Sequence, residues 1–391
     1  MLFRLPSFES MPPVARPREG EQVRVKGRPL QFSFWPMFRG TRRPGLQSRI
    51  FATNPWALIS ASIRERCPAG ARPEALASII QAESFYKAAT EAGIWAAKPL
   101  LTYYSLLNLA KAYALTEGLR PTFEKAQHGL TSMRTPGNRE LLDSFLRAFP
   151  SPNQRGDFQL FDELLQVVSG RGLQAPADYP LTTLLPQIVP GHRIWCEASG
   201  QRERFVSIEK IEIMESRARR EIWLRLSLYA DDLTRLDVTH ATLMNEGDFS
   251  PRFREITPAT DERTDRRLLR FEEVTPTSYR ARAADELQRL VSGFQNHLWA
   301  TVLSVPPYRK YYLYLSPAAE SAQRLPQLVS IYAVFYYLGS LTRYRPQFFD
   351  EILQGAYGQQ LQEILTNQPG QFLYLMASEF ARREVTRAAI V

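Results

Sequence analysis

The sequence predicts an α+β protein in which N-terminal and C-terminal helical regions are packed together, with a central antiparallel β region between them in the chain. Helical patterns occupy much of residues 73–117 and 325–389. Between them, residues 222–229 alternate with the period of two that is typical of a half-buried β-strand. Helices, then strands, then helices along one chain favour this fold class. With 391 residues, 44% of them hydrophobic, the chain can bury one large core or two to three smaller ones.

The helical elements before the β region carry different signals. Residues 73–92 follow an amphipathic helical period, and residues 98–117 form an almost uncharged helix that a glycine ends. A short helix is expected over residues 138–149, because Asn138 is a suitable N-cap and prolines follow. A helical turn is expected at residues 162–168.

The β region is predicted from alternation and from its interruptions. Residues 205–214 alternate, but the phase slips at Glu209-Lys210, which indicates a bulge or a turn. Residues 298–305 and 308–315 flank a Pro-Pro pair and should be two strands joined by a tight connection. The polar residues 257–267 are expected to form an exposed loop.

The C-terminal region returns to helical periodicity. Helices are expected over residues 325–343, 347–365 and 371–389. The first should end near Tyr344, because a residue that precedes proline, here Arg345, is biased away from helical backbone angles.

The composition limits the cellular setting. The uncharged stretch at residues 325–342 is long enough to cross a membrane. Its proline, glutamine, serine and tyrosine residues favour instead a buried helix of a soluble protein. The two cysteines, Cys67 and Cys196, are too few for a disulfide framework and fit a reducing compartment. We therefore predict a cytoplasmic protein without membrane contact and without a cofactor.

The composition also divides the chain into predicted segments: a basic aromatic N-terminal arm (residues 1–50), an N-terminal helical region (51–177), an antiparallel β-rich region (178–317) and a C-terminal helical region (318–391). The arm holds ten basic and three acidic side chains, so 10 − 3 = +7 of the net charge of +9 lies there.

Arginines interleaved with aromatic residues, as in this arm, are typical of single-stranded nucleic-acid contacts. Guanidinium groups bind the phosphates there, and rings stack on the bases. The arm residues predicted to do so are Arg24, Lys26, Arg28, Trp35, Arg39, Arg42 and Arg43. The alternative is an arm that wraps the protein's own surface and fills grooves with its aromatic side chains.

The helix predicted over residues 98–117 contains one polar stripe. Apart from its two ends, Lys111 is its only charged side chain, so most of the helix should be buried. At about 100° per residue, Tyr104, Asn108 and Lys111 lie within about 60° of one another. A buried ammonium is costly without a partner. The stripe is therefore either part of a binding site, or Lys111 reaches the surface and Asn108 bonds a neighbouring backbone group.

Two segments far apart in the sequence resemble the signatures of one family. The first comprises Lys98-Pro99-Leu100-Leu101, Tyr103-Tyr104, Asn108 to Lys111, His128-Gly129-Leu130-Thr131 and Arg134. The second runs from residue 325 to residue 350 and contains Ser340, Arg343 and Tyr344 in a Ser-x-x-Arg-Tyr motif. In this order, over residues 80–370, they are similar to the YaaC-like proteins, a bacterial family of unknown function. The resemblance implies little chemistry, and it does not include the basic arm.

Several catalytic classes lack their motifs in this sequence. The chain has no P-loop, no HExxH and no paired-cysteine zinc spacing, and no lysine follows an acid by two residues, as metal-dependent nucleases require. Arg235-x4-His240 matches the spacing of HEPN ribonucleases, but with 42 arginines about one such match arises by chance. His192 and Cys196 could share a metal ion, yet a pair without further ligands is more typical of structural residues.

The remaining candidates come from the two signature segments and are Tyr104, Asn108, Lys111, His128, Arg134, Arg343 and Tyr344. If the helical regions pack together, these side chains could converge on one pocket for a phosphate or another anion. Because no nucleophile and no orienting acid are evident, we predict a non-catalytic protein that binds a nucleotide, RNA or DNA.

Three alternatives to a binding protein remain at this point. The candidate side chains could simply bond the helices to one another. A nuclease or nucleotide-processing enzyme could use His128 as acid or base, with Lys111 and Arg343 as charge stabilisers. The protein could also be a structural partner in a multiprotein complex, such as a bacterial defence system, or in a homo-oligomer.

Overall fold

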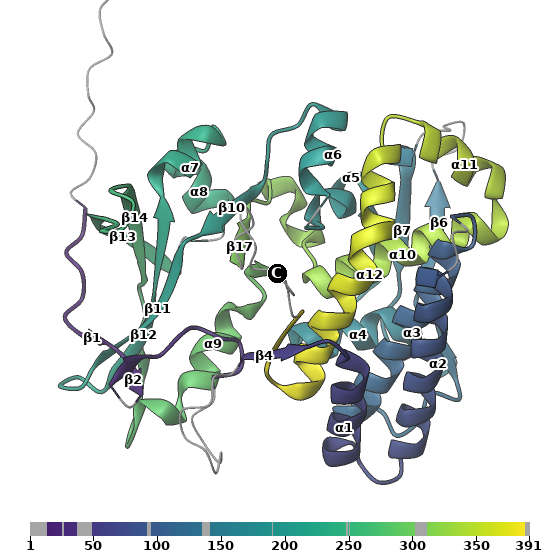
Figure 1. Ribbon diagram of the computed structural model, residues 1–391, viewed down its shortest axis with the longest axis horizontal. Helices are drawn as coiled ribbons and strands as arrows, with labels where there is room; N and C mark the ends of the chain where they lie inside the picture. The colour runs from purple at the N-terminus through teal and green to yellow at the C-terminus, as the bar shows by residue number, and fades with distance from the viewer. Residues whose placement is uncertain are drawn as a thin grey trace, which may run out of the picture.

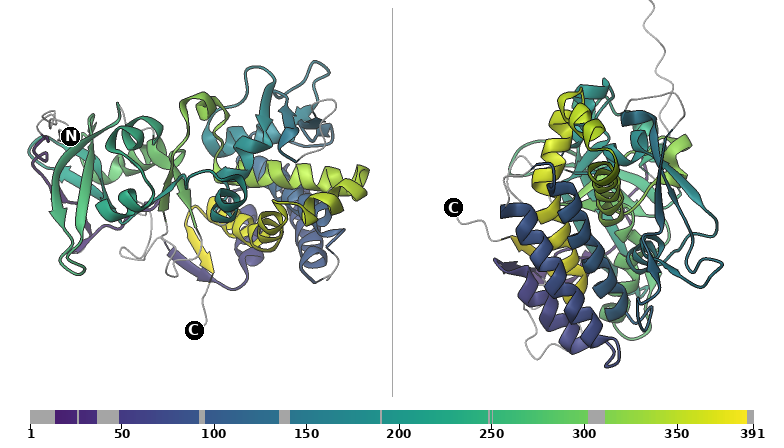
Figure 2. Two further views of the ribbon diagram at one scale, coloured as in Figure 1. Left: turned by 90° about the horizontal axis from the view of Figure 1, so that it is seen from above. Right: turned by 90° about the vertical axis from the view of Figure 1, so that its right-hand side faces the viewer.

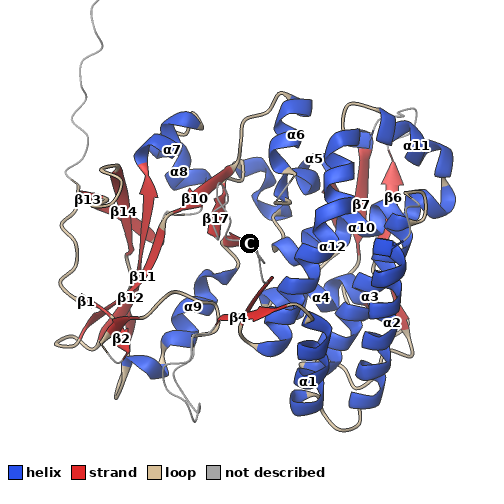
Figure 3. Cartoon of the chain, in the orientation of Figure 1, coloured by secondary structure: helices blue, strands red, loops and turns tan. Residues whose placement is uncertain are grey.

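The computed structural model describes residues 14–25, 27–36, 49–91, 95–134, 141–189, 191–247, 249, 251–301 and 311–387. It confirms the α+β class, because most helices gather on one side of the molecule and the larger antiparallel sheet lies on the other (Figure 1; Figure 3). We call these two sides the helical part and the β part. Within the described ranges, no helix is both long and apolar enough to cross a membrane.

The helical part packs around the largest core of the molecule. Its helices are α1 (Pro55–Arg66), α2 (Arg72–Glu91), α3 (Lys98–Thr116), α4 (Leu160–Ser169), α5 (Leu181–Leu184), α6 (His192–Ser199), α10 (Gln327–Tyr344), α11 (Pro346–Gln354) and α12 (Gly358–Ala381). Its strands are β5 (Ala126–Gln127), β6 (Leu130–Arg134), β7 (Ser144–Ala148), β8 (Phe158–Gln159) and β9 (Ala177–Pro180). Since α3 packs against both α10 and α12, the predicted association of the two helical regions is confirmed.

The β part has its own core. One antiparallel sheet has the order β1 (Glu21–Gln22), β11 (Lys210–Ser216), β12 (Glu221–Tyr229), β14 (Arg267–Glu273) and β13 (Phe253–Thr260), and β15 (Thr277–Ser278) also pairs with β12. A second sheet has the order β10 (Phe205–Ile208), β17 (Tyr311–Tyr314) and β16 (Leu298–Ala300). The helices here are α7 (Ala230–Arg235), α8 (His240–Glu246) and α9 (Leu287–Gln295), and β2 (Arg24–Val25) pairs with β3 (Arg28–Pro29).

The predicted break at Glu209 is confirmed and has a clear role. The strand before it, β10, pairs with β17, whereas the strand after it, β11, pairs with β12. The chain therefore changes sheets at this residue, which explains why the alternation of apolar side chains slips there.

The strand at residues 222–229 is confirmed as β12, but its predicted half-burial is wrong. Trp223 and Leu224, which point to opposite faces of the sheet, are both fully buried. The N-terminal segment covers the Trp223 side: the Arg18 guanidinium lies 5.3 Å from the Trp223 ring centroid, and a Cβ atom at Gly20 would lie 2.4 Å from that ring. The Arg18 amide also donates to the Glu272 carboxylate at 3.1 Å.

Two predictions about local structure are wrong. The short helix expected before Phe149 is a 3₁₀ turn (Leu141–Asp143) followed by strand β7, which pairs with β6 and β9. Neighbouring strands on both sides outweigh a weak helical signal there. The exposed loop expected at residues 257–267 is confined to residues 261–266, because the residues on either side pair in the β13–β14 hairpin while their polar side chains face solvent.

The C-terminal helices have other boundaries than predicted. α11 ends at Gln354, and α12 then runs without a break through Pro369 to Ala381. The break falls earlier because a Cβ atom at Gly358 would lie 2.0 Å from the Leu353 carbonyl oxygen, so only glycine allows the tight turn. The last described residues form a strand rather than a helix: β18 (Glu384–Arg387) pairs in parallel with β4 (Arg49–Ala52).

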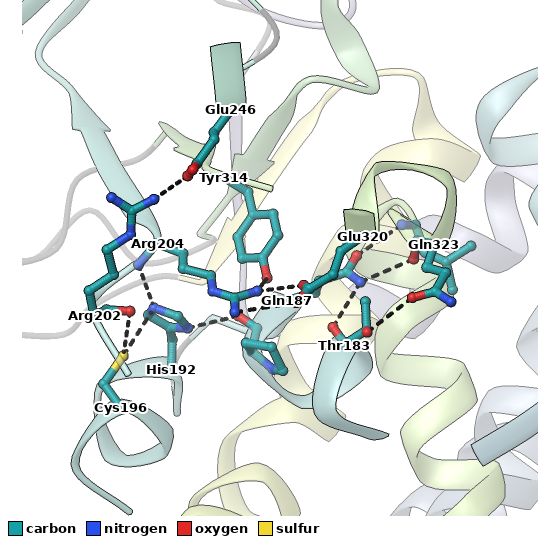
Figure 4. Close-up of polar contacts among 12 residues, drawn as sticks. Thr183, Gln187, His192, Cys196, Arg202, Arg204, Glu246, Tyr314, Glu320 and Gln323 are labelled. Atoms are coloured by element: carbon teal, nitrogen blue, oxygen red, sulfur yellow. Dashed lines mark hydrogen bonds and ion pairs between the residues drawn. The ribbon is translucent and has the colours of Figure 1, made fainter. Parts of the chain in front are cut away.

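Among the connections that the structure describes in full, one between α6 and β10 and another between β17 and α10 join the helical part to the β part (Figure 1; Figure 2). A small aromatic cluster around Trp299 packs where they meet. On the two connections, Arg204 forms an ion pair of 2.6 Å with Glu320 and donates to the Tyr314 hydroxyl at 3.2 Å (Figure 4). The junction is thus held by polar as well as apolar contacts.

Candidate functional site

The two signature segments cross at a glycine. A Cβ atom at Gly339 of α10 would lie 3.2 Å from the Tyr103 Cβ atom and 3.5 Å from the Pro99 carbonyl oxygen of α3. A side chain at this position would push the two helices apart. Glycine therefore lets α3 and α10 approach closely enough for Tyr103 to contact the aromatic face of α10.

His128 lies in the turn between β5 and β6, and the backbone fixes its position. Its carbonyl oxygen accepts a hydrogen bond of 3.1 Å from the Phe161 amide in the first turn of α4. Gly129 follows with a φ of +77°, and a Cβ atom there would lie 3.0 Å from the Gln159 carbonyl carbon. The backbone at residue 129 therefore requires glycine. The resulting turn places the His128 imidazole beside Tyr103.

Tyrosine hydroxyl groups surround the His128 ring. The Tyr103 hydroxyl oxygen lies 2.6 Å from His128 Nδ1 and 3.4 Å from the Tyr332 hydroxyl oxygen, and Tyr336 donates to the Leu130 carbonyl at 2.6 Å. Burial raises the pKa of Tyr103 well above its usual range, so this phenol keeps its proton. In the neutral imidazole, Nδ1 can accept the Tyr103 hydroxyl hydrogen, which leaves a hydrogen on Nε2 for another partner.

The positive charges of Lys111 and Arg343 both act on His128, and we call these three residues the basic cluster. Burial lowers the pKa of His128 first, and the positive charges of Arg343 and Lys111 lower it further. Burial also lowers the pKa of Lys111, an effect that the more distant Glu74 partly offsets. Among the described residues, neither Lys111 nor Arg343 forms an ion pair with a carboxylate. The charges of two cations that form no ion pair within the described part of the chain therefore act on a neutral imidazole.

The other predicted site residues are placed around the basic cluster in different ways. Asn108 is buried, and its amide donates to the Tyr104 carbonyl in its own helix at 2.9 Å. The half-buried Tyr104 ring stacks on Phe85, with centroids 5.4 Å apart. The Arg134 guanidinium packs on the Phe348 ring of α11, and its charge acts on Tyr337 rather than on His128. Asn108, Tyr104 and Arg134 therefore each contact other groups of the helical part.

Tyr344 lies at the exposed end of α10, where 66% of its surface is accessible. The Arg343 guanidinium lies 4.9 Å from its ring centroid. This contact is a cation–π pair at the surface, next to the basic cluster.

Three tyrosines of the site, Tyr103, Tyr332 and Tyr336, are absent from the residues predicted from the sequence, although their helical positions indicate them. Tyr332, Tyr336 and Arg343 lie within about 40° of one another on α10 at 100° per residue. Tyr103, the immediate neighbour of the selected Tyr104, is the residue that contacts His128. Counting helical positions on both signature helices would have favoured these tyrosines.

The described part of the N-terminal arm belongs largely to the β part. Phe32 and Phe34 are 6% and 7% exposed and lie in its core. Trp35 is half-buried and contacts Phe34 edge to face. The exposed Arg24 donates to the Gly27 carbonyl at 3.1 Å, and Arg28 is also exposed. The other predicted arm residues, Lys26, Arg39, Arg42 and Arg43, lie outside the described ranges.

The pair His192 and Cys196, considered as metal ligands, has a structural setting (Figure 4). His192 Nδ1 donates to the Pro186 carbonyl at 2.8 Å, and Nε2 accepts from the Arg204 amide at 2.8 Å. Burial lowers the pKa of His192 to about 3 and raises the pKa of Cys196 to about 12, so the imidazole is neutral and the thiol is protonated. In the described chain, no group of three or more His, Cys, Asp or Glu residues could hold a metal ion.

Two cavities of the structure lie away from the basic cluster. One lies between the helical part and the β part, opens to solvent, and includes Gln327, Glu379 and Glu384 in its wall. The other lies in the β part beside Arg252 and Glu273. No residue of the basic cluster lines either cavity.

Fold and site together define a two-part α+β protein whose helical part brings basic side chains from two distant segments into one neighbourhood. The model of the family described as YaaC-like Protein matches residues 46–380. The chain therefore belongs to the YaaC-like protein family, as the two signature segments indicated. The match leaves out residues 1–45, which are most of the basic arm. A search of curated proteins and a search of solved structures returned no match.

Proposed function

We propose that the protein binds an anionic ligand, a nucleotide or a nucleic-acid phosphate, at the basic cluster of Lys111, His128 and Arg343. The observation that carries the proposal is that two cations, which form no ion pair with a described carboxylate, both act electrostatically on one imidazole from elements at opposite ends of the chain. A half-buried ammonium such as Lys111 is costly unless a counter-ion reaches it, and a phosphate would supply that charge.

The chemistry of the surrounding groups favours binding over catalysis. The phenols nearest His128 are held protonated, since burial raises the pKa of Tyr103 and Tyr332 and brings the pKa of Tyr336 to about 12. None of them is therefore a ready nucleophile at neutral pH. His128 can donate a hydrogen bond through Nε2, and an anion held by Lys111 and Arg343 would also favour its protonated form.

Binding of a fluorescent ATP analogue, measured by anisotropy, tests the proposal. Lys111→Met and Arg343→Gln should each weaken binding about tenfold or more, because a charge-assisted hydrogen bond contributes roughly 1.5–3 kcal/mol. Arg219→Gln is the matched control, since Arg219 is an exposed arginine in the turn between β11 and β12 of the β part. Equal binding by all three variants, or an equal loss in the control, would contradict the proposed site.

A labelled single-stranded RNA separates nucleic-acid binding from nucleotide binding. RNA affinity should fall steeply with salt, and the slope should decrease when Arg24 and Arg28 are changed to glutamine, if the arm contributes phosphate contacts. Point changes are preferable to deleting the arm, because Phe32 and Phe34 are part of the β core.

The same ligands also test the enzymatic alternative. His128→Gln should weaken binding only modestly in a binding protein. Loss of product formation with unchanged ligand affinity would instead support an acid or base role for His128.

A further inference from the structure

The cavity between the helical part and the β part has an unusual balance of polar groups. Its wall is mostly apolar and includes Trp35 of the arm, Leu298 of β16, Leu328 of α10 and Val385 of β18. The empty space, including its opening to solvent, is about 690 Å³. Apolar pockets with a few placed polar groups are typical of small-molecule sites.

Four polar side chains of this wall already use donors within the protein. Gln295 donates to Glu379 at 3.1 Å, Asn296 to the Ser169 carbonyl at 3.1 Å and Gln327 to the Val189 carbonyl at 2.9 Å. Ser378 donates to the Tyr374 carbonyl at 2.9 Å and accepts from the Val385 amide. A ligand would therefore find few free donors among these side chains.

Acceptors, in contrast, remain available. Gln327 is only 6% exposed, and its Oε1 is buried without a hydrogen-bond partner among the described residues. Glu379 accepts one hydrogen bond on each oxygen, from Gln295 and from Tyr113, but forms no ion pair among the described residues. The two nearby cations, Arg66 and Arg382, both pair with Glu117 instead. A carboxylate with spare lone pairs and an unpartnered amide oxygen thus share one wall.

The helices add negative potential to the same wall. Three helices end at it: α4 contributes Val168, α9 contributes Gln295 and α12 contributes Glu379 from its last turn. Their C-terminal ends carry partial negative charge, whereas α10 alone directs an N-terminus there, at Gln327. Burial raises the pKa of Glu379 to about 7, so near neutral pH its charge depends on what occupies the cavity.

We propose that this cavity is a second ligand site, separate from the basic cluster, for a small molecule with an apolar body and a cationic N–H group such as an ammonium or amidinium. Glu379 receives the cation, Gln327 Oε1 accepts a further hydrogen bond, and the apolar wall covers the rest of the molecule.

Three compounds with the same ring and different charge test this site: benzamidine, benzamide and benzoate. At about pH 8, where Glu379 is mostly ionised, millimolar benzamidine should raise the melting temperature of the full chain more than benzamide does, and benzoate should have no effect. Glu379→Gln keeps the shape and removes the charge, so it should weaken benzamidine binding about tenfold or more and abolish the preference over benzamide.

Two further variants complete the experiment. Ala300→Leu narrows the cavity without touching the carboxylate and should weaken both benzamidine and benzamide. Glu351→Gln, at an exposed acid of α11, is the charge control and should bind as the wild type does. The proposal is overturned if benzamidine does not stabilise the wild type, if Glu379→Gln binds it equally well, or if Ala300→Leu leaves both affinities unchanged.

Discussion

At the scale of single residues, two histidines show how local contacts set the role of an imidazole. Both nitrogens of His192 are engaged by backbone groups, and its pKa falls to about 3, so this ring supports the junction in its neutral form. His128 has one nitrogen next to the Tyr103 hydroxyl, and its pKa is lowered by burial and by two cations. A ligand can change the protonation state of His128, whereas both nitrogens of His192 are already engaged within the fold.

Glu379 gives a residue-scale prediction for stability against pH. Its folded-state pKa of about 7 lies above the usual value of 4.5, so the folded protein holds a proton that the unfolded chain has released between these values. The stabilisation is complete below about pH 4.5 and is lost as the pH rises through about 7. Glu379→Gln should therefore be more stable than the wild type at about pH 8, by roughly 2–3 kcal/mol, in chemical denaturation.

Below about pH 4.5 the two proteins should have nearly equal stability, because Glu379 is then protonated in both states. Glu351→Gln controls for the loss of an exposed carboxylate. A constant difference between wild type and Glu379→Gln from acid to alkaline pH would contradict the shifted ionisation.

At the scale of elements, the crossing of α3 and α10 carries the site. Both helices are buried around most of their circumference, which accounts for their unusually apolar sequences. The uncharged stretch that is long enough for a membrane span is thus a core helix, surrounded by α3, α4, α11 and α12. The basic cluster lies where α10 and the β5–β6 turn meet α3.

The close approach at Gly339 leads to an element-scale prediction. Gly339→Val places methyl groups against Tyr103 and the Pro99 carbonyl, so α10 must shift, and we expect a loss of about 2–4 kcal/mol in the free energy of unfolding. The shift should also weaken binding of the ATP analogue, because Arg343 lies on α10. Gly70→Ala is the control, since nothing lies within 4 Å of a Cβ atom there. If Gly339→Val and Gly70→Ala were equally stable, the packing of α10 on α3 would not depend on the close contact at Gly339.

At the scale of the whole molecule, the junction between the two parts is held by a clamp. Arg204 is 7% exposed and pairs with Glu320, whose side chain is 25% exposed (Figure 4). Cavity and clamp both lie between the parts, so ligand binding and the stability of the junction should be linked.

Removing one partner of the clamp should cost more than removing both. Glu320→Ala leaves a buried guanidinium without its counter-ion and should lower the free energy of unfolding by about 2–4 kcal/mol. The double change Arg204→Met with Glu320→Leu should recover most of that loss, because no buried charge remains. Urea denaturation of both variants measures the difference. A double variant no more stable than Glu320→Ala would mean that the lost hydrogen bonds, and not the unpaired charge, dominate.

The sequence by itself determined the elements with strong periodicity and the family. The spacing of apolar residues predicts helices α2, α3 and α10, strand β12 and the pair β16–β17, because one buried face imposes a regular pattern. The sheet change at Glu209 was visible as a slip in that pattern.

Tertiary structure decided which surfaces meet. Burial of Trp223 depends on Arg18 and Gly20, some 200 residues away, and β18 forms only because β4 lies beside it. The contact of Tyr103 with His128 and the acceptor-rich cavity likewise join segments that no local pattern connects. Periodicity reports that a face is buried, but the partner that buries it is set by packing over the whole chain.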